Sequence, residues 1–139
     1  AVGYAAPHFT LTGLDQKPYK VEGKRDKPVV INFWASWCGP CQEEAPDLRD
    51  VYLQYKDQID FYAINSTSND QLDKAKKFVE EFQLPFPVPM DEKGEVTKAY
   101  QVIAFPTTFF IDKNGMIVNQ VVGMLDRAEL EKQVKKLIR

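Results

Sequence analysis

The chain has 139 residues, the length of one ordinary domain with one packed core. It is 44% hydrophobic and 27% charged with a formal net charge of -2, so we expect no nucleic-acid partner and no attraction to anionic lipid. Its apolar runs are far shorter than the roughly 18 residues of a membrane-spanning helix. The composition therefore predicts a globular protein and excludes an integral membrane span within this sequence.

The first half of the chain predicts a strand, a helix and a second strand, preceded by a hairpin over residues 9–12 and 19–21. Residues 28–34 form a nearly continuous apolar run, which is typical of a strand buried on both faces of a sheet. A helix is expected to start near Cys38, and a second strand covers residues 60–65. This order implies a parallel pair of strands joined by a right-handed crossover.

The second half predicts two helices, a hairpin and a last helix. The first helix covers about 69–82 with Ser68 as its N-cap, and an extended link over 84–90 leads to a short helix over about 92–100. Antiparallel strands over 105–112 and 116–122 follow, joined through Asn114 and Gly115. The last helix covers 126–138 and is opened by a capping box of Asp126 and Glu129.

Cys38 and Cys41, in Trp-Cys-Gly-Pro-Cys, are the two cysteines of the chain. A disulfide between them closes a very short loop and would stabilise the fold little. A zinc site needs about four N or S ligands, and the chain adds to these thiols one distant histidine, His8. A lone C-x-x-C beside a strand-helix-strand pattern favours a redox-active disulfide, so we expect no metal and no cofactor other than this pair.

The predicted start of the helix assigns a role to each sulfur. Unpaired backbone N–H groups and the helix dipole favour an anion there, so Cys38 is expected to be the readily ionised, exposed thiol. Cys41, one turn into the helix, is expected to be more covered and to resolve the mixed disulfide that Cys38 forms.

Several motifs together resemble the thioredoxin family over roughly residues 28–138: the strand before Trp37, the Cys-Gly-Pro-Cys motif, Pro46 in the following helix, and Phe-Pro-Thr-Thr at 105–108. Residues 32–38, the leading segment 6–11 and the extra helix after the second strand resemble the ResA/TlpA-like group, which is related to the AhpC/TSA redoxins. Members of this group are bacterial, usually membrane-anchored reductases that work outside the cytoplasm, some of them in cytochrome c maturation.

The resemblance implies an α/β fold of the thioredoxin type, with a central mixed β-sheet flanked by helices. It also implies an N-terminal β-hairpin extension and a helical insertion between the βαβ and ββα halves. We therefore expect a single domain over 1–139, divided into the extension (1–27), the βαβ half with the cysteines (28–65), the insertion (66–100) and the ββα half (101–139).

The resemblance further implies a thiol-disulfide oxidoreductase with Cys38 and Cys41 as catalytic residues and a cis Pro106. Substrate would bind at Trp37, Phe105, Pro106 and Thr107, with the Phe105 backbone pairing with the incoming chain. The implied partners are client proteins with disulfides and a membrane electron donor that relays from cytoplasmic thioredoxin. We expect a monomer outside the cytoplasm, tethered by an N-terminal segment that this sequence does not include; the alternative is a cytoplasmic protein.

Two residues depart from the family pattern. Classical thioredoxins carry a buried Asp where this chain has Asn32, and the cytochrome-maturation reductases place a Glu where it has Ser68. Proton transfer at the buried thiol would then rely on water, a displaced acid or slower chemistry. Glu43 and Glu44 follow the motif closely and are expected to be exposed acids on the helix surface, and Asn32 a structural hydrogen-bonding residue.

Two alternative functions stay open. A thiol peroxidase of the peroxiredoxin branch would carry a P-x-x-x-T-x-x-C pattern, but Ile31 and Ala35 occupy its Pro and Thr positions. A redox-inert binding or chaperone-like module would instead use the apolar surface near Trp37 and Phe105, and its function would survive the loss of both cysteines.

Overall fold

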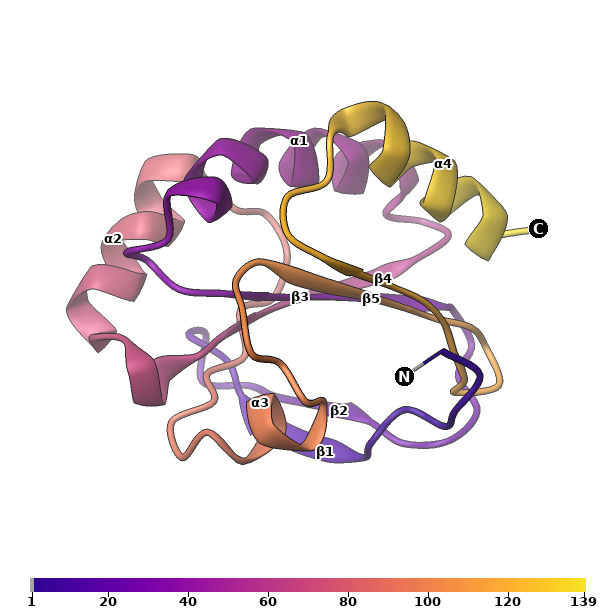
Figure 1. Cartoon of the computed structure of the whole chain (residues 1–139), viewed down its shortest axis with the longest axis horizontal. Helices are drawn as coiled ribbons and strands as arrows, with labels where there is room; N and C mark the ends of the chain where they lie inside the picture. Colours follow the sequence, from indigo (N-terminus) through magenta and orange to yellow (C-terminus); the bar gives the residue numbers. More distant parts are fainter. Residues whose placement is uncertain (1) are drawn as a thin grey trace.

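A computed structural model describes residues 2–139, and a four-stranded mixed sheet forms its centre (Figure 1). The strands lie in the order β4 (Asp60–Asn65), β3 (Val29–Trp34), β5 (Thr107–Ile111) and β6 (Ile117–Val122). β3 pairs with β4 in parallel, whereas β3 with β5 and β5 with β6 are antiparallel. The parallel pair and the antiparallel hairpin are both confirmed.

The apolar run of β3 is explained by its place between two strands. All six of its residues are buried, because side chains on both faces of this strand meet other layers of the molecule. Asn32 is the polar exception within the run. A polar side chain at such a position needs hydrogen-bond partners, and these partners lie in the site described below.

Helices cover one face of the sheet and a small second sheet covers the other (Figure 1). α1 (Gly39–Tyr55) and α4 (Arg127–Leu137) lie over the first face, and α2 (Leu72–Phe82) lies beside α1. The hairpin of β1 (Phe9–Thr12) and β2 (Pro18–Val21), together with α3 (Glu95–Ala99), lies on the opposite face. The expected thioredoxin-like α/β architecture with an N-terminal hairpin and a helical insertion is confirmed.

The two faces of the sheet bury separate apolar clusters. On the helical face, Leu48 of α1, Phe110 of β5 and Leu130 of α4 belong to one cluster, which also includes both cysteines. On the opposite face, Phe33 and Phe109 of the sheet pack with Tyr100. The disulfide is therefore part of the core on the side of the long helices.

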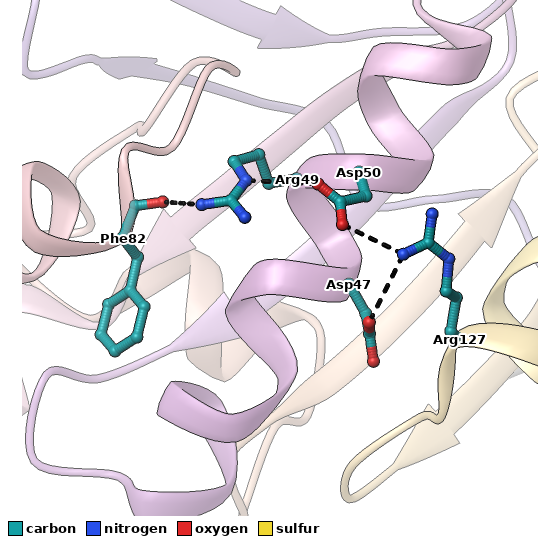
Figure 2. Close-up of polar contacts among 5 residues, drawn as sticks. All are labelled: Asp47, Arg49, Asp50, Phe82 and Arg127. Carbon is teal, nitrogen blue, oxygen red and sulfur yellow. Dashed lines mark hydrogen bonds and ion pairs between the residues drawn. The ribbon is translucent and has the colours of Figure 1, made fainter.

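Polar contacts tie α1 to both neighbouring helices (Figure 2). The Arg127 guanidinium at the start of α4 lies 3.0 Å from an Asp50 carboxylate oxygen and 4.0 Å from one of Asp47. On the other side, Arg49 donates a hydrogen bond of 3.1 Å to the backbone carbonyl of Phe82, at the end of α2. These groups are partly solvated, so they orient the helices more than they stabilise them.

The expected start of α2 was wrong. The helix begins at Leu72 with Gln71 as its N-cap, and Ser68 lies in a separate 3₁₀ turn, η1 (Thr67–Asn69). Asp70 between them has an extended backbone, which interrupts the helical path. Among residues 2–139, no helix combines the length and apolar character needed to cross a membrane.

Candidate active site

Cys38 and Cys41 form a disulfide just beyond the carboxyl end of β3, with their Cα atoms 5.2 Å apart. Cys38 is the N-cap residue of α1, and the backbone N–H of Cys41 donates to its sulfur over 3.1 Å. Pro40 occupies the first turn, where its missing N–H removes no helical hydrogen bond. The helix start thus presents a donor and a positive dipole end to the Cys38 sulfur.

The exposed fraction of the whole residue does not distinguish Cys38 from Cys41 in this disulfide form. Cys38 is 4% exposed and Cys41 is 3% exposed, so the expectation of an exposed Cys38 was wrong for this state. Both residues belong to the apolar cluster on the helical face, and Phe105 packs against that cluster. The two cysteines therefore differ in their position on α1, since Cys38 is the N-cap residue and Cys41 lies within the first turn.

The Phe105–Pro106 peptide bond, expected to be cis, is cis in the structure. The Pro106 carbonyl accepts a 2.8 Å hydrogen bond from the N–H of Gly123, which holds this loop against the segment after β6. Thr107 is buried at the start of β5, and its hydroxyl donates to the Ala104 carbonyl over 2.7 Å. Pro106 and Thr107 thus lie beneath the surface, whereas Phe105 is half-buried and reaches it.

Trp37 and Phe105 form an apolar rim beside the disulfide. Trp37 precedes Cys38 and is 61% exposed. Its ring meets the Phe105 ring edge to face, with centroids 5.9 Å apart and planes at 80°. The indole N–H donates to the Asn69 carbonyl over 2.8 Å, so this exposed side chain is held at two points.

Glu44 is buried one turn beyond Cys41 on α1, which corrects the expectation that it is a surface acid; Glu43 is exposed as expected. One carboxylate oxygen accepts a 2.9 Å hydrogen bond from the Asn32 amide, and the other accepts a 2.7 Å bond from the Leu125 N–H. Burial raises the pKa of Glu44 to about 7, although these two hydrogen bonds oppose the shift; the nearby Asp47 charge adds to it. A carboxyl group with this pKa exchanges protons near neutral pH.

Comparison with known proteins agrees with this geometry. The AhpC/TSA family model matches residues 2–120. The thiol-disulfide oxidoreductase ResA of Bacillus thuringiensis subsp. konkukian is 37% identical over 137 residues, which are 98% of this chain and 78% of that protein. ResA of Geobacillus kaustophilus is 37% identical over 138 residues, with 99% of this chain and 78% of that protein covered.

The chain belongs to the AhpC/TSA family. Within this family it is a ResA-like thiol-disulfide oxidoreductase, as the motif of Cys38 and Cys41 predicted. A solved structure of a thiol:disulfide interchange protein of the thioredoxin family from Chlorobium tepidum superposes with a TM-score of 0.88 at 28% identity, covering 100% of this chain and 99% of that one.

The structure of this AhpC/TSA-family chain brings most of the predicted site residues together. Cys38, Cys41 and the apolar rim meet at one end of the sheet, and Glu44 is the functional candidate that the pattern-based analysis missed. A sequence signal for Glu44 exists, because the apolar stripe of α1 continues backwards through it to Cys41 at alternating spacings of three and four residues. An acid within such a stripe faces the core.

Asp70 is the second polar residue of this ResA-like chain that the sequence analysis did not identify. Its carboxylate accepts hydrogen bonds from the Ser36 N–H at 2.7 Å, the Ser36 hydroxyl at 2.6 Å, the Asn65 amide at 3.0 Å and the Gln71 N–H at 2.8 Å. Burial acts to raise the pKa of Asp70, but these hydrogen bonds outweigh it, so its pKa lies below the usual value. Asp70 is therefore a carboxylate at neutral pH.

A metal ion would need a group of ligands that residues 2–139 do not bring together: no three His, Cys, Asp or Glu side chains among them are placed to hold one. Among residues 2–139, the redox-active groups are the sulfurs of Cys38 and Cys41, and both residues are buried in the disulfide form.

Proposed function

We propose that this ResA-like oxidoreductase works as a reductant, with Cys38 as the nucleophile and Cys41 as the resolving thiol. The position of Cys38 carries the assignment of nucleophile and resolving thiol, and the Gly39-Pro40 pair between the cysteines, which resembles that of reducing thioredoxins, supports the reducing direction. Its sulfur caps α1 and accepts the Cys41 N–H, and both interactions stabilise a thiolate in the reduced protein. A stabilised thiolate is both a better-populated nucleophile and a better leaving group.

Reduction of a client disulfide proceeds in two exchanges. The Cys38 thiolate attacks one client sulfur, the client S–S bond breaks, and the second client sulfur leaves as a thiolate that takes up a proton. Cys41 then attacks the Cys38 sulfur, which forms the Cys38–Cys41 disulfide and releases the first client sulfur. Two electrons pass to the client in one cycle. The client thiols take up two protons, one from Cys41 and one from solvent because Cys38 starts as a thiolate, and the enzyme disulfide must then be reduced by a donor.

Glu44 supports the second exchange as a proton acceptor for Cys41. The Cys41 thiol must lose its proton before it attacks, and it is buried, which disfavours an isolated thiolate. Glu44 follows it by three residues, on the same buried face of α1, and its pKa of about 7 suits proton uptake at neutral pH. Asn32 positions the carboxylate from β3.

The client proteins and the donor are inferred from the family. The ResA relatives are thiol-disulfide oxidoreductases, and this supports clients with disulfides. We assign the protein to the outer face of the bacterial cytoplasmic membrane, tethered by a segment outside this sequence and reduced by a membrane protein that relays electrons from cytoplasmic thioredoxin. Cytochrome c maturation or a similar extracytoplasmic reduction is the proposed process; in cytochrome c maturation the apoprotein motif C-x-x-C-H must be reduced before haem attachment.

Two measurements test this function. The reduction potential of the Cys38–Cys41 pair is measured by equilibration in defined dithiothreitol buffers, and a value near or below about -230 mV is expected for a reductant. A value near about -120 mV would reverse the proposed direction of electron flow. The Cys41→Ala variant should trap clients as mixed disulfides on Cys38, whereas the Cys38→Ala variant should trap none at this position.

A further inference from the structure

The loop between β4 and α2 holds the segment that precedes the nucleophile. Asp70 in this loop accepts both the N–H and the hydroxyl of Ser36, at 2.7 Å and 2.6 Å. Ser36 lies two residues before Cys38, and its carbonyl accepts a 3.1 Å hydrogen bond from the Gln42 side chain of α1. Asp70 and Gln42 thus hold Ser36 in the turn before Cys38 through three hydrogen bonds.

The same loop holds the apolar rim. Its Asn69 carbonyl accepts the indole N–H of Trp37, and the Trp37 ring then meets Phe105 edge to face. Trp37 is 61% exposed, so the core packing of its ring is too limited to fix its orientation. Its orientation depends on the loop, and the loop is anchored by Asp70 through Asn65 of β4, whose amide donates to the carboxylate at 3.0 Å.

We propose that Asp70 is a positioning residue for client binding: through Ser36 and the loop it holds Trp37 against Phe105, so that the apolar rim is preformed for an apolar client segment beside the disulfide. This inference rests on the proposed function, in which a polypeptide disulfide is the substrate. A preformed aromatic surface binds more tightly because fewer side-chain conformations are lost on binding. Asp70 has no hydrogen bond to either sulfur among residues 2–139, and the proposal places its effect on client recognition through Trp37.

The proposal predicts that Asp70→Ala slows the reaction with a large peptide disulfide but not the reaction with a small one. A peptide disulfide flanked by apolar residues contacts the apolar rim, whereas hydroxyethyl disulfide is too small to use it. Asp70→Ala should lower the second-order rate constant of the reduced protein with the peptide by roughly tenfold, the value of one charge-assisted hydrogen bond. The rate constant with hydroxyethyl disulfide and the reduction potential should match those of the unsubstituted protein.

The experiment compares five variants with the unsubstituted protein by rapid-mixing kinetics, using a synthetic peptide that contains one Cys-x-x-Cys disulfide flanked by leucines, and hydroxyethyl disulfide. Asp73→Ala is the matched control, since Asp73 is an exposed acid on the first turn of α2 with no side-chain partner within residues 2–139. Asp70→Asn retains an acceptor for Ser36 and should lose less than Asp70→Ala, which keeps the test usable if the alanine variant folds poorly. Trp37→Ala and its combination with Asp70→Ala complete a double-mutant cycle.

If Asp70 acts through Trp37, Asp70→Ala has no further effect on the peptide reaction once Trp37→Ala is present. An additive loss in the double variant would overturn the proposal, as would an equal loss with both disulfides, a changed reduction potential or no loss with the peptide. A high reduction potential in the unsubstituted protein would instead contradict the reductant function. The test of Asp70 does not depend on that outcome. Whether the reduction potential is low or high, the reduced Cys38 forms mixed disulfides with both the peptide and hydroxyethyl disulfide, so their two rate constants can still be compared.

Discussion

The Asn32 amide donates a 2.9 Å hydrogen bond to the Glu44 carboxylate, in the core beside the disulfide. Asn32 occupies the strand position at which classical thioredoxins have an acid, and here the acid comes from α1 instead. The same amide also donates to the Thr108 hydroxyl at 3.0 Å, so both of its N–H bonds have partners. A displaced acid, one of the three expected solutions for proton transfer, is therefore present in this chain.

Glu44 should make the stability of the oxidised protein fall as the pH rises. Its folded pKa of about 7 lies above the ordinary value of 4.5, so the folded state binds more protons between these two values. The contribution of Glu44 to the free energy of unfolding is fully present below pH 4.5, declines as the pH rises toward 7 and is lost above pH 7. The total loss is roughly 3 kcal/mol. Urea unfolding of the oxidised protein at pH 5 and pH 8 measures the difference.

Glu44→Gln is the variant that isolates this effect, because its amide does not titrate. The substitution leaves one acceptor oxygen for two donors and should lower stability by roughly 1 to 3 kcal/mol at pH 5, with a smaller difference at pH 8, where the unsubstituted protein has lost stability through Glu44. The decline between pH 5 and pH 8 should nevertheless be lost. An unchanged decline in this variant would show that other groups cause it.

Glu44→Gln should also slow the attack by Cys41. When the reduced protein reacts with Ellman's reagent, the first thionitrobenzoate reports attack by Cys38 and the second reports attack by Cys41 on the mixed disulfide. We expect the second phase to slow by about 100-fold at pH 7, since a positioned base is lost, while the first phase stays within about twofold. In the unsubstituted protein the rate constant of the second phase, plotted against pH, should inflect near pH 7, and this inflection should be absent from Glu44→Gln.

Glu43→Gln serves as the control for this reaction, because Glu43 is exposed on the same turn of α1. It removes the same charge without touching the buried network, and both phases should keep their rates. Equal slowing in the two variants would attribute the effect to surface charge and would remove the role proposed for Glu44.

The contacts of α4 with the core should stabilise it far more than its ion pairs do. Leu130 is fully buried under the helix, so Leu130→Ala should cost roughly 2 to 5 kcal/mol. Arg127→Ala removes the pair with Asp50 shown in Figure 2, but these side chains are 49% and 38% exposed, and water screens the interaction. Its loss should cost less than about 1 kcal/mol.

Urea midpoints of the two α4 variants measure this contrast at one pH. Raising the salt concentration should shrink the small effect of Arg127→Ala further and leave that of Leu130→Ala unchanged. A larger loss for Arg127→Ala than for Leu130→Ala would mean that the polar contacts, and not apolar burial, hold α4 in place.

The strand and helix pattern of the sheet could be read from the sequence because each element is defined by its own residues. The apolar run of β3, the Asn-Gly turn before β6 and the Asp126 N-cap all appear in the structure at the expected places; of the predicted capping box, the bond from the Glu129 N–H to the Asp126 carboxylate is present. The start of α2 could not be read in this way. Ser68 fits a local capping pattern, but Asp70 is held extended by Ser36, a residue 34 positions earlier in the chain.

The sequence alone determined the chemistry of this protein, since two cysteines at this spacing before a helix, with few other ligands, leave thiol-disulfide exchange as the favoured reaction. The tertiary structure decided what surrounds the sulfurs. Burial of Glu44, its pKa, and the placement of Trp37 by Asn69 and Asp70 depend on segments that meet only after folding. Hydrogen bonds and desolvation act through space, so residues distant in sequence set the proton and client chemistry of a motif that is local.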